Sequence, residues 1–401
     1  MLDVFFTIGA VLILGFITSM IFELTKIPDV IILIFVGMIV GPVLKIVPVE
    51  GPISTLAPYV GTLALIIILF DGGLNLNLFK VLTALAEAAG FTIMVFILTV
   101  IFTGFTMHYI FGWAYLEGLL LGAVVGGTSS AIVIPLISKL SMSEDSKVVL
   151  TLESALTDAL CIIVAIALIE IIGLGTVNLR DTAGSIASAF STAAVTAAVF
   201  AVFWIGIINK LFIKQIRYSL TLAVVFILYS LVELIKGNGA IAVFVFALLL
   251  SNFNELAKRL KVKGEFELDI MLRAFHVEVS FFVRTFFFIF IGLMFNIDAL
   301  KSRTVLIMAG VLFIILIIAR ILVVKVLALI DKKIAPFQMS IISMMPRGLA
   351  AAVLASMPLA AGIKIQYFPE IVFSIIILTN LATTFGVFMI ERKMSTVKVN
   401  I

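Results

Sequence analysis

Residues 115–138 read YLEGLLLGAVVGGTSSAIVIPLIS, an apolar run that a short polar sequence, GGTSS, interrupts near its middle. Crossing the hydrocarbon core of a bilayer takes about 20 apolar residues, so this run is long enough to span a membrane. A break at its centre frees backbone N–H and C=O groups where there is no water to pair with them. Such a break is tolerated where the freed groups line a cavity or meet a compensating side chain, so the run is interpreted as a broken membrane helix.

A second interrupted run lies 219 positions further along the chain. By this offset Thr128, in the first break, maps onto Arg347, in the sequence Pro-Arg-Gly, and the pattern Gly-Leu-x-x-Asn at 73–77 recurs at 292–296. An odd number of expected crossings separates the copies, so they run through the membrane in opposite directions. Inverted repeats with interrupted helices are typical of transporters whose site lies at the bilayer midplane. Alternatively, the small residues only allow close helix packing.

The composition of the whole chain favours a membrane protein. Of its 401 residues, 63% are apolar and 12% are charged, whereas soluble domains average about 45–50% and 25%. This excludes a soluble globular protein and predicts an all-α polytopic membrane protein with about 13 transmembrane helices. The expected spans lie near 4–23, 28–46, 58–78, 85–108, 115–138, 146–173, 184–209, 217–235, 238–253, 276–296, 303–330, 336–362 and 367–391.

The basic residues are distributed unequally between the two sides of this arrangement. Alternate connections carry 17 Lys and Arg, and the other connections carry 6. Because cytoplasmic loops are enriched in Lys and Arg, we expect a multi-pass protein of the cell (cytoplasmic) membrane with its N-terminus outside and its C-terminus inside. No basic run is interleaved with aromatic residues, so no nucleic-acid partner is expected.

The strongest chemical signal is the sequence LESALTDAL at 152–160, inside an expected span. Asp158 falls near the centre of the bilayer, where an acid is costly and functional by default. A carboxylate that holds a proton and a cation in turn is sufficient for exchange, because the two ligands compete for one negative charge. A buried ion pair without a transport role is the alternative.

Several hydroxyl groups are candidate ligands for such a cation. Ser154 precedes Asp158 by one turn and shares its helical face. Thr128, Ser129 and Ser130 stand in the first break, where their oxygens can replace the water around a small cation. The alternative is that each hydroxyl bonds only to its own helix.

A second acid on the same helix is interpreted as structural. Glu153 is about 140° around the helix from Asp158, so the two acids should face different partners. A guanidinium within a membrane is always charged and needs a buried acid or carbonyl groups. Three arginines qualify as the partner of Glu153: Arg284, Arg320 and Arg347. At the second break, Arg347 can instead offset the carbonyl ends of a helix.

The remaining polar residues suggest neither an enzyme nor a cofactor protein. His108 and His276 fall near the ends of expected spans and are expected at the membrane interface. We find no metal-ligand cluster, no Ser/His/Asp set and no phosphate-binding glycine motif. No cofactor is expected, and no metal beyond a transported Na⁺ or K⁺.

These motifs together resemble the cation:proton antiporter superfamily, and most closely the archaeal NhaP-type sodium/proton antiporters. The resemblance is carried by Ile-Pro-Asp at 27–29, Phe-Asp-Gly-Gly-Leu at 70–74, Glu-Ser and Thr-Asp within 153–158, Phe-Ile-Phe-Ile-Gly at 288–292, Ala-Arg at 319–320 and Pro-Arg-Gly-Leu at 346–349. It implies a homodimer of 13-span subunits, in which a core with two crossed broken helices moves against a dimerisation domain. We assign 1–57 and 184–275 to the dimerisation domain, and 58–183 and 276–401 to the core.

The resemblance also implies roles for individual residues. Asp158 corresponds to the ion and proton carboxylate, and Thr128 and Ser154 to residues that help to bind the ion. Glu153 and Arg320 correspond to a structural ion pair of the family.

Two positions depart from the pattern of the NhaP-type members. These usually have Thr-Asp-Pro at the first break, where this chain has Thr128, Ser129 and Ser130, so a second carboxylate ligand is missing. They usually have Asn before the key Asp, where this chain has Thr157, which joins the cation-binding candidates. The choice between Na⁺ and K⁺ therefore stays open.

The sequence thus predicts a secondary antiporter that exchanges a monovalent cation for H⁺ by alternating access. Na⁺ or Li⁺ is favoured, and exchange is expected to be electroneutral because one carboxylate serves both ligands. The expected partners are the cation, H⁺, the lipid bilayer and a second copy of the chain. The alternatives are a K⁺/H⁺ antiporter and a passive cation channel, whose flux would not depend on a proton gradient.

Overall fold

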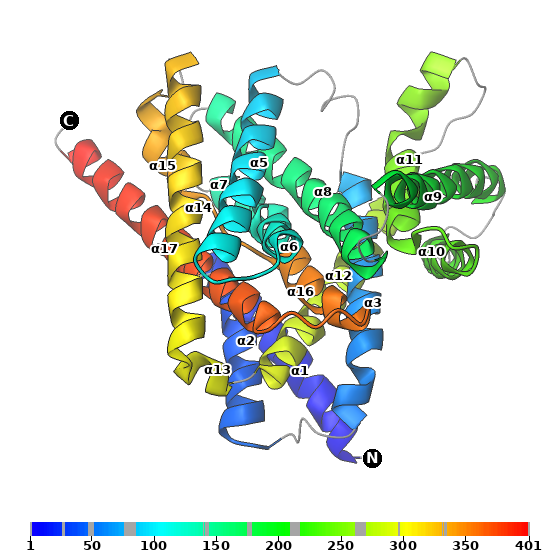
Figure 1. The fold of residues 1–401 in the computed structure, drawn as a ribbon, viewed down its shortest axis with the longest axis horizontal. Coiled ribbons are helices and arrows are strands. Elements are labelled where there is room, and N and C mark those ends of the chain that lie inside the picture. The colour runs from blue at the N-terminus through cyan, green and yellow to red at the C-terminus, as the bar shows by residue number, and fades with distance from the viewer. Residues whose placement is uncertain are drawn as a thin grey trace. The chain divides into compact units, whose positions relative to one another are not determined.

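The computed structural model describes residues 2–25, 29–46, 52–75, 86–138, 140, 144–174, 179–208, 217–260, 270–295, 297–330, 332 and 335–399. Every regular element in these ranges is helical (Figure 1), which confirms the predicted all-α class. The elements are α1 (Leu2–Thr25), α2 (Asp29–Met38), the π-helical turn η1 (Ile39–Val43), α3 (Pro52–Asn75), α5 (Ala86–Tyr109), α6 (Tyr115–Val125), α7 (Ser130–Ser138), α8 (Glu144–Leu174), α9 (Leu179–Ile208), α10 (Arg217–Leu234), α11 (Gly239–Leu260), α12 (Ile270–Met294), α13 (Ile297–Lys301), α14 (Arg303–Ile330), the 3₁₀ turn η3 (Ala335–Phe337), α15 (Gln338–Ser343), α16 (Leu349–Ala360) and α17 (Phe368–Val399).

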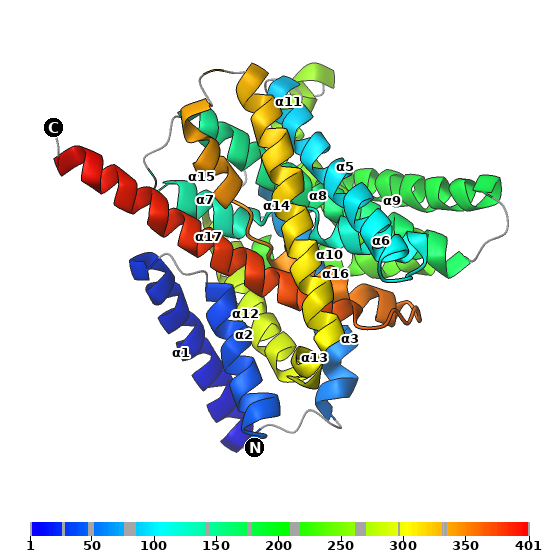
Figure 2. The same cartoon turned by 60° about the vertical axis from the view of Figure 1, so that its left-hand side comes forward.

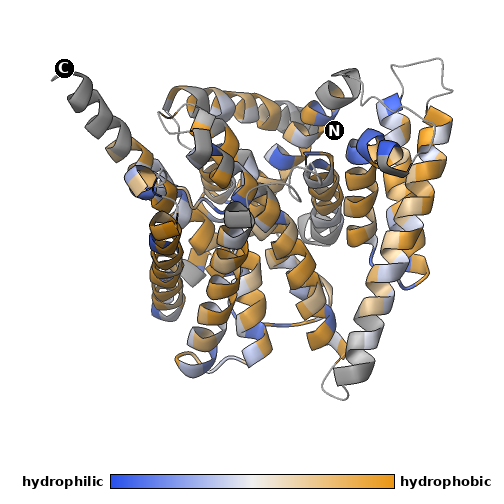
Figure 3. Cartoon of the chain, turned by 90° about the horizontal axis from the view of Figure 1, so that it is seen from above, coloured by the Kyte–Doolittle hydropathy of each residue, from blue (hydrophilic) through white to orange (hydrophobic). Residues whose placement is uncertain are grey.

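Most of these helices are strongly apolar along their length (Figure 3). Within the described ranges, eight helices are long and apolar enough to cross a membrane: α5, α8, α9, α10, α11, α12, α14 and α17. Five shorter apolar helical segments are found in α1, in α2 with η1, and in α3, α6 and α16. The multi-pass prediction therefore holds, whereas the count of thirteen spans, the orientation of the termini and the choice of the cell membrane stay predictions.

The two interruptions fall where the sequence places them. The first broken segment ends as α6 at Val125 and restarts as α7 at Ser130, and the second ends as α15 at Ser343 and restarts as α16 at Leu349. The residues between the half-helices include Thr128 and, in the second segment, Arg347. Both broken helices of the predicted fold are therefore present.

The other repeated pattern includes glycines at close helix crossings. A Cβ atom at Gly73 would lie 2.6 Å from the Cβ atom of Ala247, and one at Gly292 would lie 2.8 Å from the Cα atom of Gly37. These positions thus fit the alternative that small residues permit close packing. Asn77 and Asn296, which complete the pattern, lie outside the described residues.

The chain divides into two compact units. The first comprises Met1–Pro58, Leu85–Gly173 and Thr285–Ile401, and the second comprises Tyr59–Ala84 and Leu174–Arg284. The predicted division into a dimerisation domain and a core concerns assembly and movement, and it stays a prediction.

The first unit contains both broken helices. Figure 2 shows α1 beside α2, and α5 beside α14, in agreement with Figure 1. A buried apolar cluster joins α5, α7, α8, α14, α15 and α17, with Leu136, Leu150, Val324, Ile341 and Met344 among its members. Because this cluster includes residues of α7, α8 and α15, it fixes the half-helices that meet at the breaks.

The second unit includes α9, α10 and α11, and it contains a buried polar contact around His276. His276, which is expected at the membrane interface, is buried against neighbouring helices, with 3% of its surface exposed. Its ring nitrogens lie 2.9 Å from Asp71 Oδ1 and 3.1 Å from the hydroxyl of Tyr218. The candidate membrane span within α12 begins at Phe275, so His276 lies near a span end, and its position at the membrane interface stays a prediction.

Candidate functional site

The two helix breaks contact each other directly. The backbone N–H of Ser129, in the first break, donates to the carbonyl oxygen of Pro346, in the second, over 2.9 Å. A Cβ atom at Gly348 would lie 2.6 Å from the Cβ atom of Ser129, so only glycine leaves room for this approach. Residues that are more than 200 positions apart are thereby brought to one point.

Asp158 lies at the N-terminus of α7. Its Oδ2 atom accepts hydrogen bonds from the backbone N–H of Ser130 (3.2 Å) and from the Ser130 hydroxyl (2.7 Å). Ser130 is the first residue of α7, and the N-terminus of a helix carries a partial positive charge. Both bonds and the helix dipole therefore stabilise the charged carboxylate in the middle of the span.

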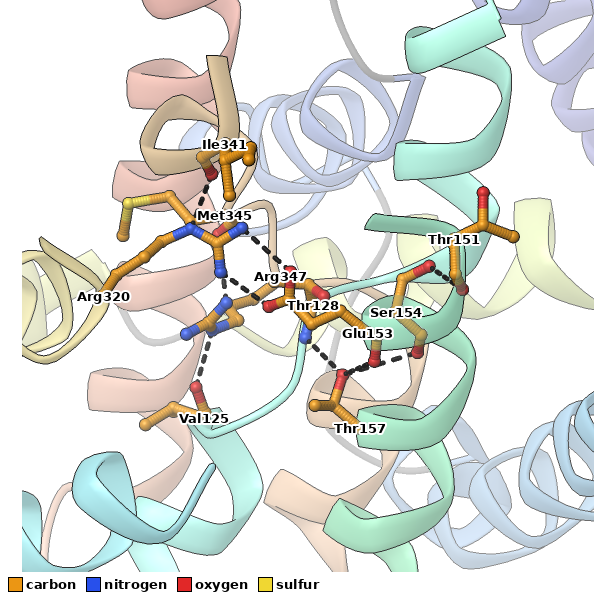
Figure 4. A network of polar contacts seen from close by, with 10 residues as sticks. All are labelled: Val125, Thr128, Thr151, Glu153, Ser154, Thr157, Arg320, Ile341, Met345 and Arg347. Atoms are coloured by element: carbon orange, nitrogen blue, oxygen red, sulfur yellow. Dashed lines mark hydrogen bonds and ion pairs between the residues drawn. The ribbon is translucent and has the colours of Figure 1, made fainter. Parts of the chain in front are cut away.

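Thr157 connects the first break to α8. The N–H of Thr128 donates to Thr157 Oγ1 over 3.0 Å, and that hydroxyl in turn donates to the carbonyl oxygen of Glu153 over 2.8 Å (Figure 4). The side-chain oxygen of Thr128 is buried and has no hydrogen-bond partner among the described residues. The Thr128 hydroxyl thus remains available to a ligand.

The remaining hydroxyls occupy different surroundings. Ser154 is buried and donates to the carbonyl oxygen of Thr151, one turn earlier in α8, over 3.1 Å. This is the own-helix bond named above as the alternative, although the oxygen of Ser154 keeps lone pairs for a cation. Ser129 is buried beside Gly348.

Arg347 pairs with buried backbone carbonyl groups at the breaks. Its Nε donates to the carbonyl oxygen of Val125, the last residue of α6, over 2.6 Å, and its Nη1 donates to that of Met345 over 3.2 Å (Figure 4). The sequence left two roles open for Arg347, as the partner of Glu153 or as the partner of carbonyl groups at a helix end. The structure shows the second. Each half-helix of the first segment thus faces a charge opposite in sign to the partial charge of its own end. Arg347 faces the negative end of α6, and Asp158 faces the positive start of α7.

Arg320 pairs with Glu153 in the interior of the same unit. Its Nη1 and Nη2 atoms lie 2.6 and 3.0 Å from the two carboxylate oxygens of Glu153, and its Nε donates to the carbonyl oxygen of Ile341 over 2.9 Å. Both side chains are buried, with only 1–2% of their surface exposed. Figure 4 shows the guanidinium between the acid and the end of α15.

The sequence analysis missed two residues of α17. The N–H of Arg347 donates to Thr379 Oγ1 over 3.2 Å, and Asn380 Nδ2 donates to the carbonyl oxygen of Arg347 over 2.6 Å. Both backbone groups of Arg347 are thus satisfied by a helix that has no break of its own. Their own segment gave no distinctive signal, because Ser374, Thr383 and Thr384 are further polar residues of the same helix.

The oxygens gathered here suit a monovalent cation. They are carboxylate, hydroxyl and backbone carbonyl oxygens, the kinds of group that replace the hydration shell of such an ion. Within the described ranges, no group of three or more His, Cys, Asp or Glu side chains gathers as a metal site.

The sequence of this chain is similar to those of known proteins. The family described as "Sodium/hydrogen exchanger, transmembrane" matches residues 9–392. The chain is 28% identical to Na(+)/H(+) antiporter 1 of Methanocaldococcus jannaschii over 169 residues, which are 42% of this chain and 39% of that protein. It is 32% identical to K(+)/H(+) antiporter NhaP2 of Shewanella sp. (strain MR-4) over 176 residues, which are 42% of this chain and 29% of that protein.

The fold also matches a solved structure. The sodium proton antiporter MjNhaP1 from Methanocaldococcus jannaschii at pH 8 superposes with a TM-score of 0.74 and 22% sequence identity, over 96% of this chain and 95% of that chain. The similarity supports the arrangement of helices described above. The matched regions span less than half the length of the two antiporters named above.

Proposed function

Because this chain belongs to the family of transmembrane sodium/hydrogen exchangers, we propose that it is a secondary antiporter, which exchanges a monovalent cation for H⁺ by alternating access. Na⁺ or Li⁺ is the favoured cation. The names of the relatives include both Na⁺/H⁺ and K⁺/H⁺ antiporters, so K⁺ is the second candidate.

The observation that carries this proposal is the position of Asp158. Its carboxylate is half-buried beside Ser130, at the N-terminus of a half-helix. A proton on this carboxylate removes the charge that attracts a cation, and a bound cation disfavours the proton. Binding of the two ligands is therefore mutually exclusive, which is the requirement for exchange.

The surrounding polar groups supply oxygens for the cation. We propose that Ser154, Thr157, Thr128, Ser129 and Ser130 contribute to the cation site together with Asp158. Support comes from the two bonds between Ser130 and Asp158, from the bond between Thr128 and Thr157, and from the buried, unpaired oxygen of Thr128 within the described part of the chain.

The other buried charges do not alternate in this mechanism. Glu153 is held by two bonds from Arg320, and Arg347 is directed at carbonyl oxygens. One carboxylate then carries either one proton or one monovalent cation, and the loaded site has the same charge in both directions. We therefore propose one-for-one, electroneutral exchange.

The setting of this exchanger is also part of the proposal. We place it in the cytoplasmic membrane as a homodimer, with its N-terminus outside and its C-terminus inside. The support is the excess of Lys and Arg on alternate connections and, for the dimer, the family resemblance.

The test is the collapse of an imposed pH gradient in proteoliposomes on addition of Li⁺, Na⁺ or K⁺. We expect Asp158→Asn to fold and to lose exchange with every cation, because the amide neither titrates nor attracts the cation. Asp298→Asn, at an acid whose side chain is 82% exposed, is the matched control and should exchange at the wild-type rate. Proton-coupled flux at the wild-type rate in folded Asp158→Asn would refute the assignment.

The same vesicles distinguish the alternatives. A K⁺/H⁺ antiporter would collapse the gradient with K⁺ in preference to Na⁺. A passive channel would pass cations at a rate that does not depend on the proton gradient.

A further inference from the structure

Asn380, on α17, is tied to the second helix break by its side-chain amide. Nδ2 donates to the carbonyl oxygen of Arg347 over 2.6 Å and to that of Ile376, in the preceding turn of α17, over 2.8 Å. The side chain is fully buried. The residue therefore belongs to the crossing of the breaks, although α17 itself is a continuous helix.

The orientation of this amide is determined by its partners. Both contacts are carbonyl oxygens, which can only accept, so the NH₂ group must face them and use both of its hydrogens. The Oδ1 atom consequently faces away from Arg347 and Ile376. It is buried and has no hydrogen-bond partner among the residues that the structure describes.

A second buried oxygen without a hydrogen-bond partner among the described residues is connected to Asn380 through the bonds between the two breaks. Thr128 Oγ1 is also buried without a partner in the described ranges. Thr128 is adjacent to Ser129, whose N–H donates to Pro346, and Pro346 is adjacent to Arg347, which Asn380 holds. One unpaired oxygen thus belongs to the first break, and the other belongs to the residue of α17 that holds the second break.

Two such oxygens at a transporter's helix crossing point to a ligand. A buried carbonyl or hydroxyl oxygen without a donor is costly, unless a group with positive charge or a hydrogen bond pairs with it. A partly dehydrated monovalent cation is such a group, and oxygens of this kind replace its hydration shell.

We propose that Asn380 is a cation-selectivity residue of this transporter. Its Nδ2 atom fixes the backbone carbonyl of Arg347, and its Oδ1 atom is an oxygen ligand that the cation meets at the crossing together with Thr128 Oγ1. This assignment rests on the proposed antiport function. It extends the site from the two broken helices and α8 to a third element, α17.

The test compares three variants in proteoliposomes with an imposed pH gradient. Asn380→Leu keeps the size of the side chain and removes both polar atoms, and Asn380→Ser removes the amide without adding bulk. Ser374→Ala is the matched control, because Ser374 is a buried residue of α17 whose hydroxyl donates to the carbonyl oxygen of Glu370 in its own helix over 2.7 Å. The apparent KM and the maximal rate are measured for Li⁺, Na⁺ and K⁺ in each variant.

We expect the Asn380 variants to raise the apparent KM of the preferred cation about tenfold, equivalent to about 1.4 kcal/mol. We also expect them to change the ratio of the KM values among the three cations, whereas Ser374→Ala keeps the wild-type values. A role in the fold alone would lower the amount of active protein or the maximal rate and would leave the ratio of the KM values unchanged.

Three results would overturn the proposal. They are wild-type KM values in a folded Asn380 variant, a lower maximal rate with an unchanged cation ratio, and loss of folding in both Asn380 variants, which would assign the residue to the fold. The activity of the wild-type protein distinguishes a failure of this proposal from a failure of the proposed function. A wild-type protein that exchanges no cation refutes the antiport and this assignment together, whereas unchanged Asn380 variants of an active protein refute only this assignment.

Discussion

Removing one partner of the buried pair Glu153–Arg320 should cost more stability than removing both. The variant Arg320→Met leaves the carboxylate of Glu153 charged at a site where 1% of that side chain is exposed. Breaking a buried pair from one side costs about 3–5 kcal/mol. The variant also removes the bond from Arg320 Nε to the carbonyl oxygen of Ile341, 2.9 Å long, which adds about 1–3 kcal/mol.

The double variant Glu153→Gln with Arg320→Met removes the stranded charge and keeps only the second of these losses. We therefore expect the double variant to be more stable than Arg320→Met by at least about 2 kcal/mol. The pair Asp298–Lys301 is the control, since its side chains are 82% and 74% exposed. Lys301→Met should change stability by less than about 1 kcal/mol, because exposed ion pairs contribute little.

Thermal unfolding of all four proteins in one detergent measures this order. The double variant should melt above Arg320→Met, and Lys301→Met should melt close to the wild-type protein. If the double variant melts at or below Arg320→Met, the carboxylate of Glu153 is not stranded by the loss of Arg320, and the reasoning fails.

Three further predictions concern packing, the first break and coupling. Gly37→Ala should destabilise the protein by about 1–3 kcal/mol, because the new Cβ atom would lie 2.8 Å from the Cα atom of Gly292. Gly310→Ala is the control, because its new Cβ atom would meet no atom within 4 Å, and it should be neutral or stabilising in the same melting assay. Thr157→Val should lower exchange, because the N–H of Thr128 loses its 3.0 Å acceptor, and Thr157→Ser should restore it; equal rates in the two variants would contradict this role. Vesicles clamped with valinomycin at different membrane potentials in a Na⁺ assay should reach the same balance between the cation gradient and the proton gradient. A potential of 100 mV would contribute about 2.3 kcal/mol per net charge moved, so a shift of this balance with potential would show that a second group exchanges a proton.

The sequence predicted the features that leave a local mark. The polar interruption at Thr128 and the sequence Pro-Arg-Gly around Arg347 were visible because they break apolar runs, and the structure has helix ends at both. The proposed exchange carboxylate was also visible, since Asp158 is an acid in the middle of an apolar span. The all-helical class followed from composition and from the length of the runs.

Other features depend on contacts between distant segments and leave little local trace. Thr379 and Asn380 lie in a continuous helix, so nothing in their own segment indicated that they hold the backbone of Arg347. His276 was expected near a span end, and a candidate span does begin at Phe275, but nothing in its own segment indicated its contacts with Asp71 and Tyr218. The bond from Arg347 to Val125 decided between two roles that the sequence had left open.

The crossing of the breaks also has a consequence for how the chain is assembled. No residue of either break has a positive φ angle, so the breaks are held by partners from elsewhere and not by strained backbone. Those partners, Pro346 for Ser129 and residues of α17 for Arg347, are synthesised long after the first broken segment has left the ribosome. The N–H groups of Thr128 and Ser130 find their partners earlier, on α8, but the N–H of Ser129 and the C=O of Val125 must be paired by another group until Pro346 and Arg347 are made, because lipid cannot pair with them. The contact between the two breaks can therefore close only after the C-terminal third of the chain has been synthesised.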